Sequence, residues 1–109
     1  MQFIQHDLPG IIEYIPTKFH DDRGHFYESY NQTRFAANGI TENFVQDNYS
    51  FSTAGVIRGL HFQKDPHGQG KLVRCMTGKV MDVVVDLRKS SPTFGQHGKY
   101  ILDAEIGNM

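Results

Sequence analysis

Three basic side chains of different chemistry, Arg58, His61 and Lys71, occur in two neighbouring stretches, Gly55–Gln63 and Gly68–Arg74. The residues around them alternate between apolar and polar as in a β-strand, and a charged group on a strand with a buried face is costly without a partner or a ligand. A histidine near its reference pKa accepts protons at neutral pH, and a nearby ammonium stabilises a developing oxyanion. His61 and Lys71 therefore suit proton abstraction next to a carbonyl group.

A structural explanation competes with this chemistry. His61 could be a satisfied core or rim histidine and Lys71 a solvated strand charge, and the pair alone favours that explanation because such pairs are common. Alternation along a strand also places Arg58 and His61 on opposite faces. The two could share a face only if Gly59 forms a bulge that redirects one of them.

A metal site is the next alternative, because many small β-barrels bind a metal through a His-x-His pair and a carboxylate. Here Gln63 follows His61 at the second position, and Lys71 stands where a carboxylate would follow on the returning strand. A lysine opposes a divalent cation, so the usual nitrogen and oxygen ligands are missing. A lone loop histidine such as His67 is more often solvent-exposed. The sequence predicts no metal site.

Two further groups of polar residues could bind a ligand. Arg23 presents a fork suited to phosphate oxygens, and Glu28 could accept a hydrogen bond from a base or a sugar. The alternative is a surface turn with an ion pair of little energetic value. The amides of Gln46 and Asn48 could contact a polar ligand, or could merely satisfy an edge strand.

The composition excludes several classes of protein. The chain has 11 lysines and arginines against 12 aspartates and glutamates, a formal net charge of -1, which gives no support for nucleic acid or a membrane surface as a partner. Its apolar runs fall far short of the roughly 20 residues that cross a bilayer, and no signal peptide is evident. A single cysteine, Cys75, excludes an internal disulfide and is typical of the cytoplasm.

The elements that must position these residues are mostly strands. One short helix is expected over Asn31–Gly39, with Asn31 as N-cap and Asn38-Gly39 as its end. Phe19–Gly24 reads as a turn, Thr77–Gly78 as a tight hairpin connection, and Asp82 and Asp86 as the solvated side of an otherwise apolar strand. The expected strands are Ile11–Ile15, His25–Tyr30, Glu42–Ser50, Val56–Gln63, Lys71–Met76, Lys79–Leu87 and Lys99–Glu105.

Short strands separated by Gly/Pro turns indicate an all-β antiparallel sandwich or barrel of the jelly-roll kind. The length of 109 residues favours one domain over residues 1–109. A jelly roll ordinarily needs about eight strands, so we expect this one to be incomplete at its C-terminal end. Open edges and an uncovered core face would then favour association with another chain.

Five stretches taken together resemble the dTDP-4-dehydrorhamnose 3,5-epimerases, in the same order and over essentially the whole chain. They are 22–28 (DRGHFYE), 44–48 (FVQDN), 55–63 (GVIRGLHFQ), 69–74 (QGKLVR) and 85–95 (VDLRKSSPTFG). The resemblance implies a cupin-like jelly roll that epimerises C3 and C5 of dTDP-4-dehydro-6-deoxy-D-glucose, giving dTDP-4-dehydro-L-rhamnose, without metal or other cofactor.

The resemblance also implies roles for individual residues. His61 is the expected base that removes protons at C3 and C5, and Arg58 is expected in the sugar and phosphate pocket. Lys71 is expected to bind the substrate and to stabilise the enolate oxygen at C4. This agrees with the chemistry inferred from the residues, because a 4-keto group acidifies both neighbouring carbons.

The same resemblance assigns the remaining binding residues and a partner chain. Arg23 and Glu28 would help to hold the nucleotide, and Gln46 and Asn48 would line the same pocket. In this family the N-terminal segment crosses to the site of the partner subunit, which implies a homodimer with exchange of that segment. The expected partner molecule is a dTDP-sugar.

The family pattern continues for several tens of residues beyond the last strand expected here. That further part supplies the tyrosine that reprotonates the sugar and the acidic residue that orients the base, and Tyr100 does not match the tyrosine's motif. Two alternatives therefore stay open. One is a truncated, non-catalytic module for nucleotide-sugar binding or dimerisation, and the other is a related dTDP-keto-sugar isomerase. Gln63, which stands in place of a histidine two residues after His61, favours the epimerase over that isomerase.

Overall fold

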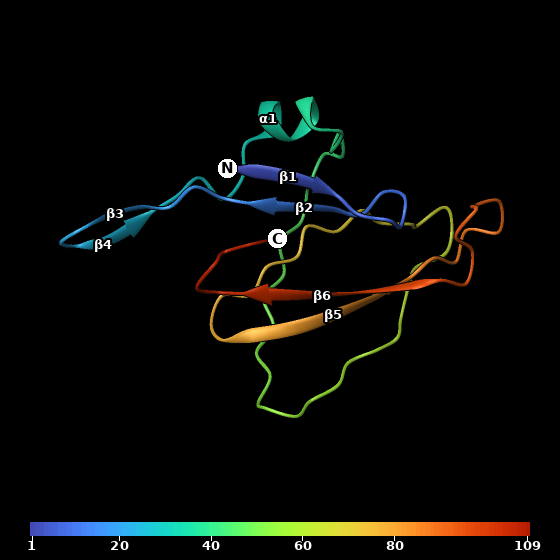
Figure 1. Cartoon of the computed structure of the whole chain (residues 1–109). Helices are drawn as coiled ribbons and strands as arrows, with labels where there is room; N and C mark the ends of the chain where they lie inside the picture. The colour runs from blue at the N-terminus through green and yellow to red at the C-terminus, as the bar shows by residue number, and fades with distance from the viewer. The chain divides into compact units, whose positions relative to one another are not determined.

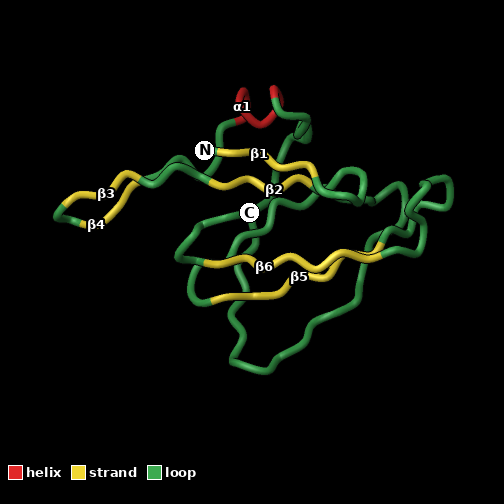
Figure 2. Tube along the Cα trace, in the orientation of Figure 1, coloured by secondary structure: helices red, strands yellow, loops and turns green.

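The computed structural model describes residues 1–109 and contains six strands, in three two-stranded antiparallel sheets, and one helix (Figures 1 and 2). By their contacts the residues form two compact units. The first unit comprises residues 1–41 and 72–109 and holds every helix and strand, and the second comprises residues 42–71. No helix is long and apolar enough to cross a membrane. A single domain over 1–109 stays a prediction.

Strands β1 (Gln2–Gln5) and β2 (Ile12–Ile15) form the first sheet, with Phe3 opposite Tyr14. The predicted strand Ile11–Ile15 is confirmed as β2, whereas β1 is an element that the sequence patterns did not indicate. On the other edge of β2, Tyr14 and Met109 exchange backbone hydrogen bonds of 2.9 and 3.0 Å. Tyr14, Phe35 and Met109 together form the buried core of the first unit.

Helix α1 (Gln32–Ala37) confirms the predicted helix and both of its ends. The side chain of Asn31 accepts a hydrogen bond of 3.1 Å from the backbone N–H of Arg34, which is the N-cap interaction. The backbone N–H of Asn38 bonds back to Phe35 at 3.0 Å. So short a helix is not stable alone, and Phe35, 2% exposed, holds it against Tyr14 at 5.0 Å between ring centroids.

Strands β3 (Phe19–Asp21) and β4 (Gly24–Phe26) form a hairpin that extends away from β1 and β2 (Figure 1). The sequence predicted only a turn over Phe19–Gly24, but the turn itself is reduced to Asp22 and Arg23. The predicted strand His25–Tyr30 correspondingly begins one residue earlier and ends at Phe26. The hairpin thus presents Arg23 at its tip.

Strands β5 (Lys79–Val85) and β6 (His97–Asp103) pair along their full length, with Asp82 opposite Tyr100. They confirm the predicted strands Lys79–Leu87 and Lys99–Glu105, with bounds shifted by two residues at one or both ends. The predicted hairpin at Thr77–Gly78 is wrong, because β5 pairs with β6 and not with residues 71–76. Lys79 and Asp103 close the far end of the ladder with an ion pair of 2.7 Å.

Three predicted strands, Glu42–Ser50, Val56–Gln63 and Lys71–Met76, are not strands in this structure. An extended segment becomes a strand only when its N–H and C=O groups meet those of a neighbouring backbone, and no such ladder forms here. Most of their apolar side chains are accordingly exposed, with Ile57 at 92% and Leu60 at 75%, whereas Leu72 is partly buried against the core of the first unit. The apolar alternation therefore predicts that one face of each segment is apolar, but it does not determine whether a neighbouring backbone is present to form hydrogen bonds with the segment.

Candidate functional site

The second unit carries five of the seven residues that the sequence indicated for binding or catalysis. These are Gln46, Asn48, Arg58, His61 and Lys71. All five side chains are exposed, but so is every residue from 45 to 71, so exposure does not distinguish these five from their neighbours. The other two, Arg23 and Glu28, belong to the first unit.

His61 lies directly against Gly59. Gly59 has φ +107°, a conformation that side-chain-bearing residues rarely adopt, and a Cβ at that position would approach Nδ1 of His61 to 3.3 Å and its backbone N to 3.4 Å. The strict alternation that would set Arg58 and His61 on opposite faces is therefore interrupted at Gly59. The His61 imidazole has no hydrogen-bond or ion-pair partner and is open to a substrate.

Arg58 is held by the segment that precedes it. Its Nε donates to Ser52 Oγ at 2.9 Å and its Nη2 donates to the Phe51 carbonyl oxygen at 3.0 Å. A guanidinium has further N–H donors in the same plane, and those of Arg58 stay available for an anion. Sequence patterns assigned no function to Phe51 or Ser52, and only the structure shows that they orient Arg58.

Lys71 ends the second unit, and no hydrogen bond or ion pair joins it to His61. Next to it, a Cβ at Gly70 would come within 2.9 Å of Glu42 Cγ, so the two ends of the unit are in close contact. The two candidate amides contact each other, since Gln46 Nε2 donates to Asn48 Oδ1 at 3.1 Å. The pair presents a combined polar surface within the same unit as His61.

Arg23 forms an ion pair with Asp21, with 2.6 Å between Nη2 and Oδ2, and its side chain is 90% exposed. This hydrogen-bonded arginine holds the pKa of the Asp21 carboxyl below its ordinary value. Glu28 instead meets Arg34 at 3.5 Å and accepts from the Asn31 amide at 3.3 Å. The two residues therefore have separate partners in the first unit.

Asp86 was predicted to lie on the solvated side of its strand, and that prediction is wrong. It follows the end of β5 and is only 5% exposed. Its carboxylate accepts hydrogen bonds from Arg88 Nε at 2.9 Å, Ser91 Oγ at 2.5 Å and Thr93 Oγ1 at 2.6 Å. These donors, Arg88 above all, hold the pKa of Asp86 far below its ordinary range.

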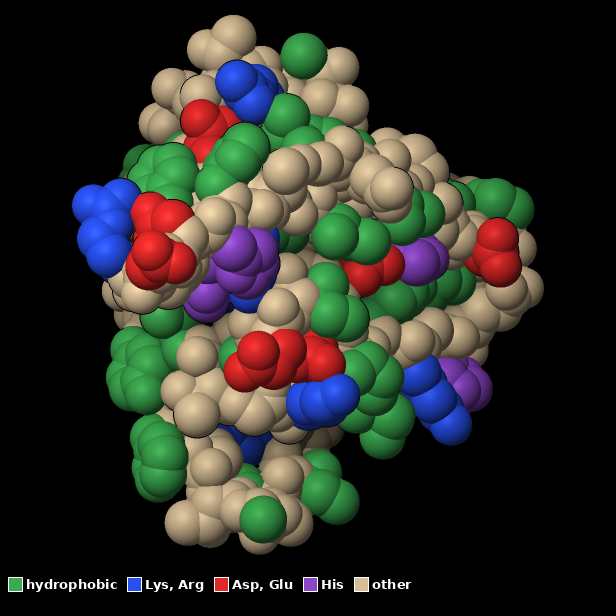
Figure 3. Space-filling view, turned by 60° about the vertical axis from the view of Figure 1, so that its left-hand side comes forward, with side chains coloured by type: hydrophobic (Ala, Val, Ile, Leu, Met, Phe, Trp, Pro, Cys, Tyr) green, Lys and Arg blue, Asp and Glu red, His purple; other side chains and the backbone are tan.

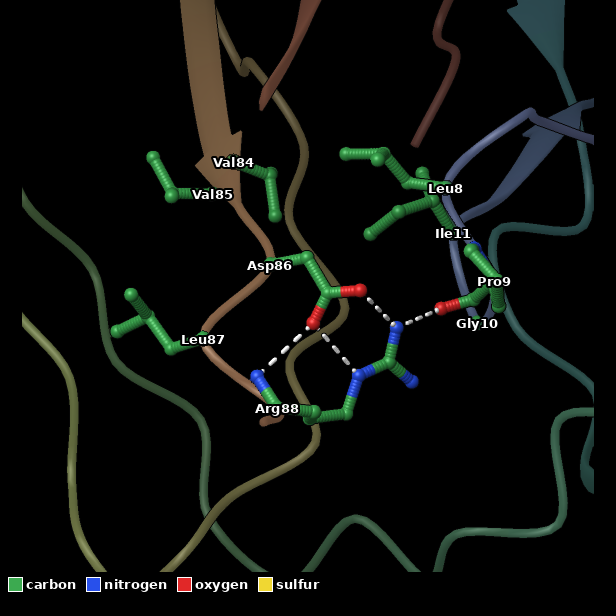
Figure 4. Close-up of a pocket in the computed structure, with 9 residues that line it drawn as sticks. All are labelled: Leu8, Pro9, Gly10, Ile11, Val84, Val85, Asp86, Leu87 and Arg88. Atoms are coloured by element: carbon green, nitrogen blue, oxygen red, sulfur yellow. Dashed lines mark hydrogen bonds and ion pairs between the residues drawn. The ribbon is translucent and has the colours of Figure 1, made fainter. Parts of the chain in front are cut away.

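The Asp86 cluster borders a pocket of about 280 Å³ in the first unit. Figure 4 shows Arg88 between Asp86 and Pro9, and its Nη2 donates to the Pro9 carbonyl oxygen at 2.7 Å. The lining is otherwise mainly apolar: Leu8, Pro9, Gly10, Ile11, Val84, Val85, Asp86, Leu87 and Arg88. None of the seven candidate residues lines this pocket. The hydrogen bonds of the Asp86 cluster instead hold the loop that follows β5.

The structure holds no group of three or more His, Cys, Asp or Glu side chains able to bind a metal ion.

Solved structures assign the class of the fold. The chain superimposes with a TM-score of 0.94 and 49% identity on an epimerase from Bacillus anthracis solved with TDP and PPi bound, covering 98% of this chain and 62% of that one. A second structure, from Legionella pneumophila in complex with dTDP-4-keto-L-rhamnose, gives a TM-score of 0.92 at 44% identity, with 98% and 57% covered. The predicted all-β, cupin-like jelly roll is confirmed.

Sequence comparisons then give the family. Residues 5–109 match the family model of dTDP-4-dehydrorhamnose 3,5-epimerase. The relative of that name from Shigella flexneri is 53% identical over 106 residues, which are 96% of this chain and 59% of the relative. The one from Pseudomonas aeruginosa is 54% identical over 99 residues, which are 90% of this chain and 54% of the relative. The chain belongs to the dTDP-4-dehydrorhamnose 3,5-epimerase family, and it spans between half and two thirds of the length of these relatives.

Proposed function

We propose that this protein epimerises C3 and C5 of dTDP-4-dehydro-6-deoxy-D-glucose, giving dTDP-4-dehydro-L-rhamnose. The observation that carries the proposal is the close approach of the His61 imidazole to Gly59, in the run that also holds Arg58. Membership of the family over residues 5–109 supports it. The ligands named in the two related structures, TDP and dTDP-4-keto-L-rhamnose, support the substrate class.

The chemistry needs only proton transfers. His61 removes the proton from C3 or C5, the electrons of the broken C–H bond move into an enolate, and the Lys71 ammonium stabilises the negative charge on the C4 oxygen. Return of a proton to the opposite face inverts that carbon and restores the ketone. Because the C4 ketone acidifies both neighbours, one base and one oxyanion-stabilising group serve both carbons. No oxidation state changes, and the proposed reaction requires no cofactor.

Binding would be shared among the other candidate residues. Arg58, with donors left over from Ser52 and Phe51, would contact phosphate or sugar oxygens, and the amides of Gln46 and Asn48 would line the same pocket. Arg23 and Glu28 would contact the nucleotide. The single cysteine, Cys75, is free, which supports a cytoplasmic location for the proposed reaction.

The proposal includes a homodimer that exchanges the N-terminal segment, which contains the β3–β4 hairpin. Phe19 and Phe26, which face each other across that hairpin, are 64% and 72% exposed. Large apolar side chains gathered on a projecting element are typical of a surface that another chain covers. The hairpin would then bring Arg23, at its tip, to the site of the partner subunit.

One observation favours a second candidate, a nucleotide-sugar-binding module without catalysis. Neither an acidic residue nor any other group orients the His61 imidazole, although a general base normally needs such a partner. Solvent deuterium exchange at C3 and C5 of the substrate separates the candidates when it is combined with calorimetry of dTDP binding. Exchange supports the epimerase, whereas dTDP binding without exchange supports the binding module. Absence of dTDP binding contradicts both.

A further inference from the structure

Two histidines face each other across the β3–β4 hairpin and belong to no part of the proposed active site. His20 and His25 are directly opposite in the strand register, and both are exposed. Their ring centroids lie 5.4 Å apart with the ring planes at 52°. Figure 3, in which the side of the molecule at the left of Figure 1 comes forward, shows adjacent histidine side chains at the surface.

This separation matches that of two imidazoles bound to one metal ion. With metal–nitrogen bonds of about 2.0–2.1 Å, two rings on the same ion have centroids roughly 5 Å apart. Imidazole is a ligand suited to copper, nickel and zinc, and the strand register sets the two rings directly opposite each other. We propose that His20 and His25 form a two-histidine site for a divalent copper, nickel or zinc ion, with water in the remaining positions.

Two neighbouring side chains, Tyr27 and Lys18, form the surroundings of the His20–His25 pair. The His25 ring stacks on Tyr27, with centroids 5.9 Å apart and planes at 21°, which restricts its orientation. Lys18, the nearby cation, lies over the other ring of that stack at 5.1 Å from the Tyr27 centroid and donates to the carbonyl oxygens of Ala104 and Glu105. Its ammonium is thus engaged by the Tyr27 ring and by two backbone oxygens.

The acidic groups of the hairpin do not complete a closed site. The Asp21 carboxylate is engaged by Arg23, and no third histidine, cysteine or carboxylate joins the pair in a metal-binding group. Two protein ligands make an open, hydrated site, unlike the four-ligand structural zinc sites. An ion bound here would join β3 to β4 next to the turn that carries Arg23, and so would stiffen the hairpin.

The test is a titration of the full 109-residue chain with CuCl₂, followed through the histidine ring signals in NMR spectra. A paramagnetic Cu²⁺ ion at this site broadens the His20 and His25 signals together by the first equivalent. The ring signals of His67 and His97, which are exposed elsewhere, stay sharp. Equal broadening of all exposed histidines would overturn the proposal, and this measurement needs no variant.

Variants give an independent reading. His20→Asn and His25→Asn each weaken Cu²⁺ binding in calorimetry by at least about tenfold, since loss even of an outer-shell partner of a ligand costs 10- to 100-fold. His67→Asn and His97→Asn are the matched controls and bind as the parent chain does. The affinity order is Cu²⁺ above Ni²⁺, and Mg²⁺, which prefers oxygen ligands, does not compete. Unchanged Cu²⁺ affinity in both hairpin variants contradicts the site.

Discussion

Gly59 and His61 are so close that any side chain at position 59 would contact the imidazole, with Cβ only 3.3 Å from Nδ1 of His61. A contact that short requires the histidine ring to shift. The backbone at Gly59, at φ +107°, also disfavours every residue except glycine. The position of the proposed base is therefore set by a neighbour that has no side chain.

Gly59→Ala should displace the His61 ring and lower the rate of substrate proton exchange. Gly55→Ala is the matched control, because Gly55 also has positive φ, at +84°, but its Cβ would meet nothing within 4 Å. Both variants carry a similar backbone strain, of order 1–3 kcal/mol. Exchange rates measured side by side should fall further for Gly59→Ala, and equal losses would contradict the role of this contact.

Lys71→Met should slow proton exchange at both carbons while leaving dTDP binding nearly unchanged. The reason is that the ammonium stabilises the negative charge that develops on the C4 oxygen as the proton is removed, and dTDP alone does not contain that oxygen. Removal of one such group costs about 10²–10³ in rate. Lys64→Met, in the same unit, is the control. A loss of dTDP affinity that accounts for the whole loss of rate would reassign Lys71 to binding.

Phe35→Ala should destabilise the first unit by about 3–5 kcal/mol, the usual cost of removing a buried aromatic ring. Phe35 is 2% exposed and joins helix α1 to Tyr14 and Phe3, whereas Phe94, 54% exposed, offers a control of the same chemistry. Urea unfolding of the two variants measures the difference. A Phe35→Ala chain as stable as Phe94→Ala would mean that this cluster is not the core.

Asp86 should make the first unit sensitive to acid. Its folded-state pKa is lowered by Arg88, Ser91 and Thr93, so its contribution to stability is fully present above the unfolded-state pKa of about 3.9. The contribution is lost as the pH falls below that value toward the folded-state pKa. Thermal unfolding from pH 7 down to pH 2 should show a steeper loss for the parent chain than for Asp86→Asn.

Asp82→Asn is the control for that series, because Asp82 lies on β5 opposite Tyr100 and takes no part in the cluster. It should keep the acid sensitivity of the parent chain. If Asp86→Asn and Asp82→Asn show the same pH dependence as the parent, the Asp86 cluster does not control acid stability.

The sequence predicted those elements whose signals are local. Asn31 and Asn38 mark the ends of α1 by capping, and the apolar run of β5 needs no distant information. Pairing is not local, so the apolar alternation around His61 predicted a strand that has no partner here. Strand β1 was missed because it is stabilised by tertiary contacts, namely its pairing with β2 and the packing of Phe3 on Tyr14.

The contacts of individual side chains likewise separate into those with a local sequence signal and those that depend on the tertiary structure. The backbone N–H of Arg88 bonds to the Asp86 carboxylate at 3.0 Å, a turn typical of aspartate two residues earlier, and this pattern could have indicated that Asp86 ends the strand. Residue types alone identified His61, Lys71 and Arg58 as candidates. They could not indicate that Ser52 and the Phe51 carbonyl orient Arg58, because nothing in the sequence pattern specifies those contacts.

The most direct test of His61 as the base is proton exchange at C3 and C5 of dTDP-4-dehydro-6-deoxy-D-glucose in D₂O, followed by NMR. The parent chain should incorporate deuterium at both carbons. His61→Asn should abolish incorporation at both while still binding dTDP, and His67→Asn, a change of the same kind in the same unit, should leave it intact. Incorporation by His61→Asn at the rate of the parent chain would contradict the account.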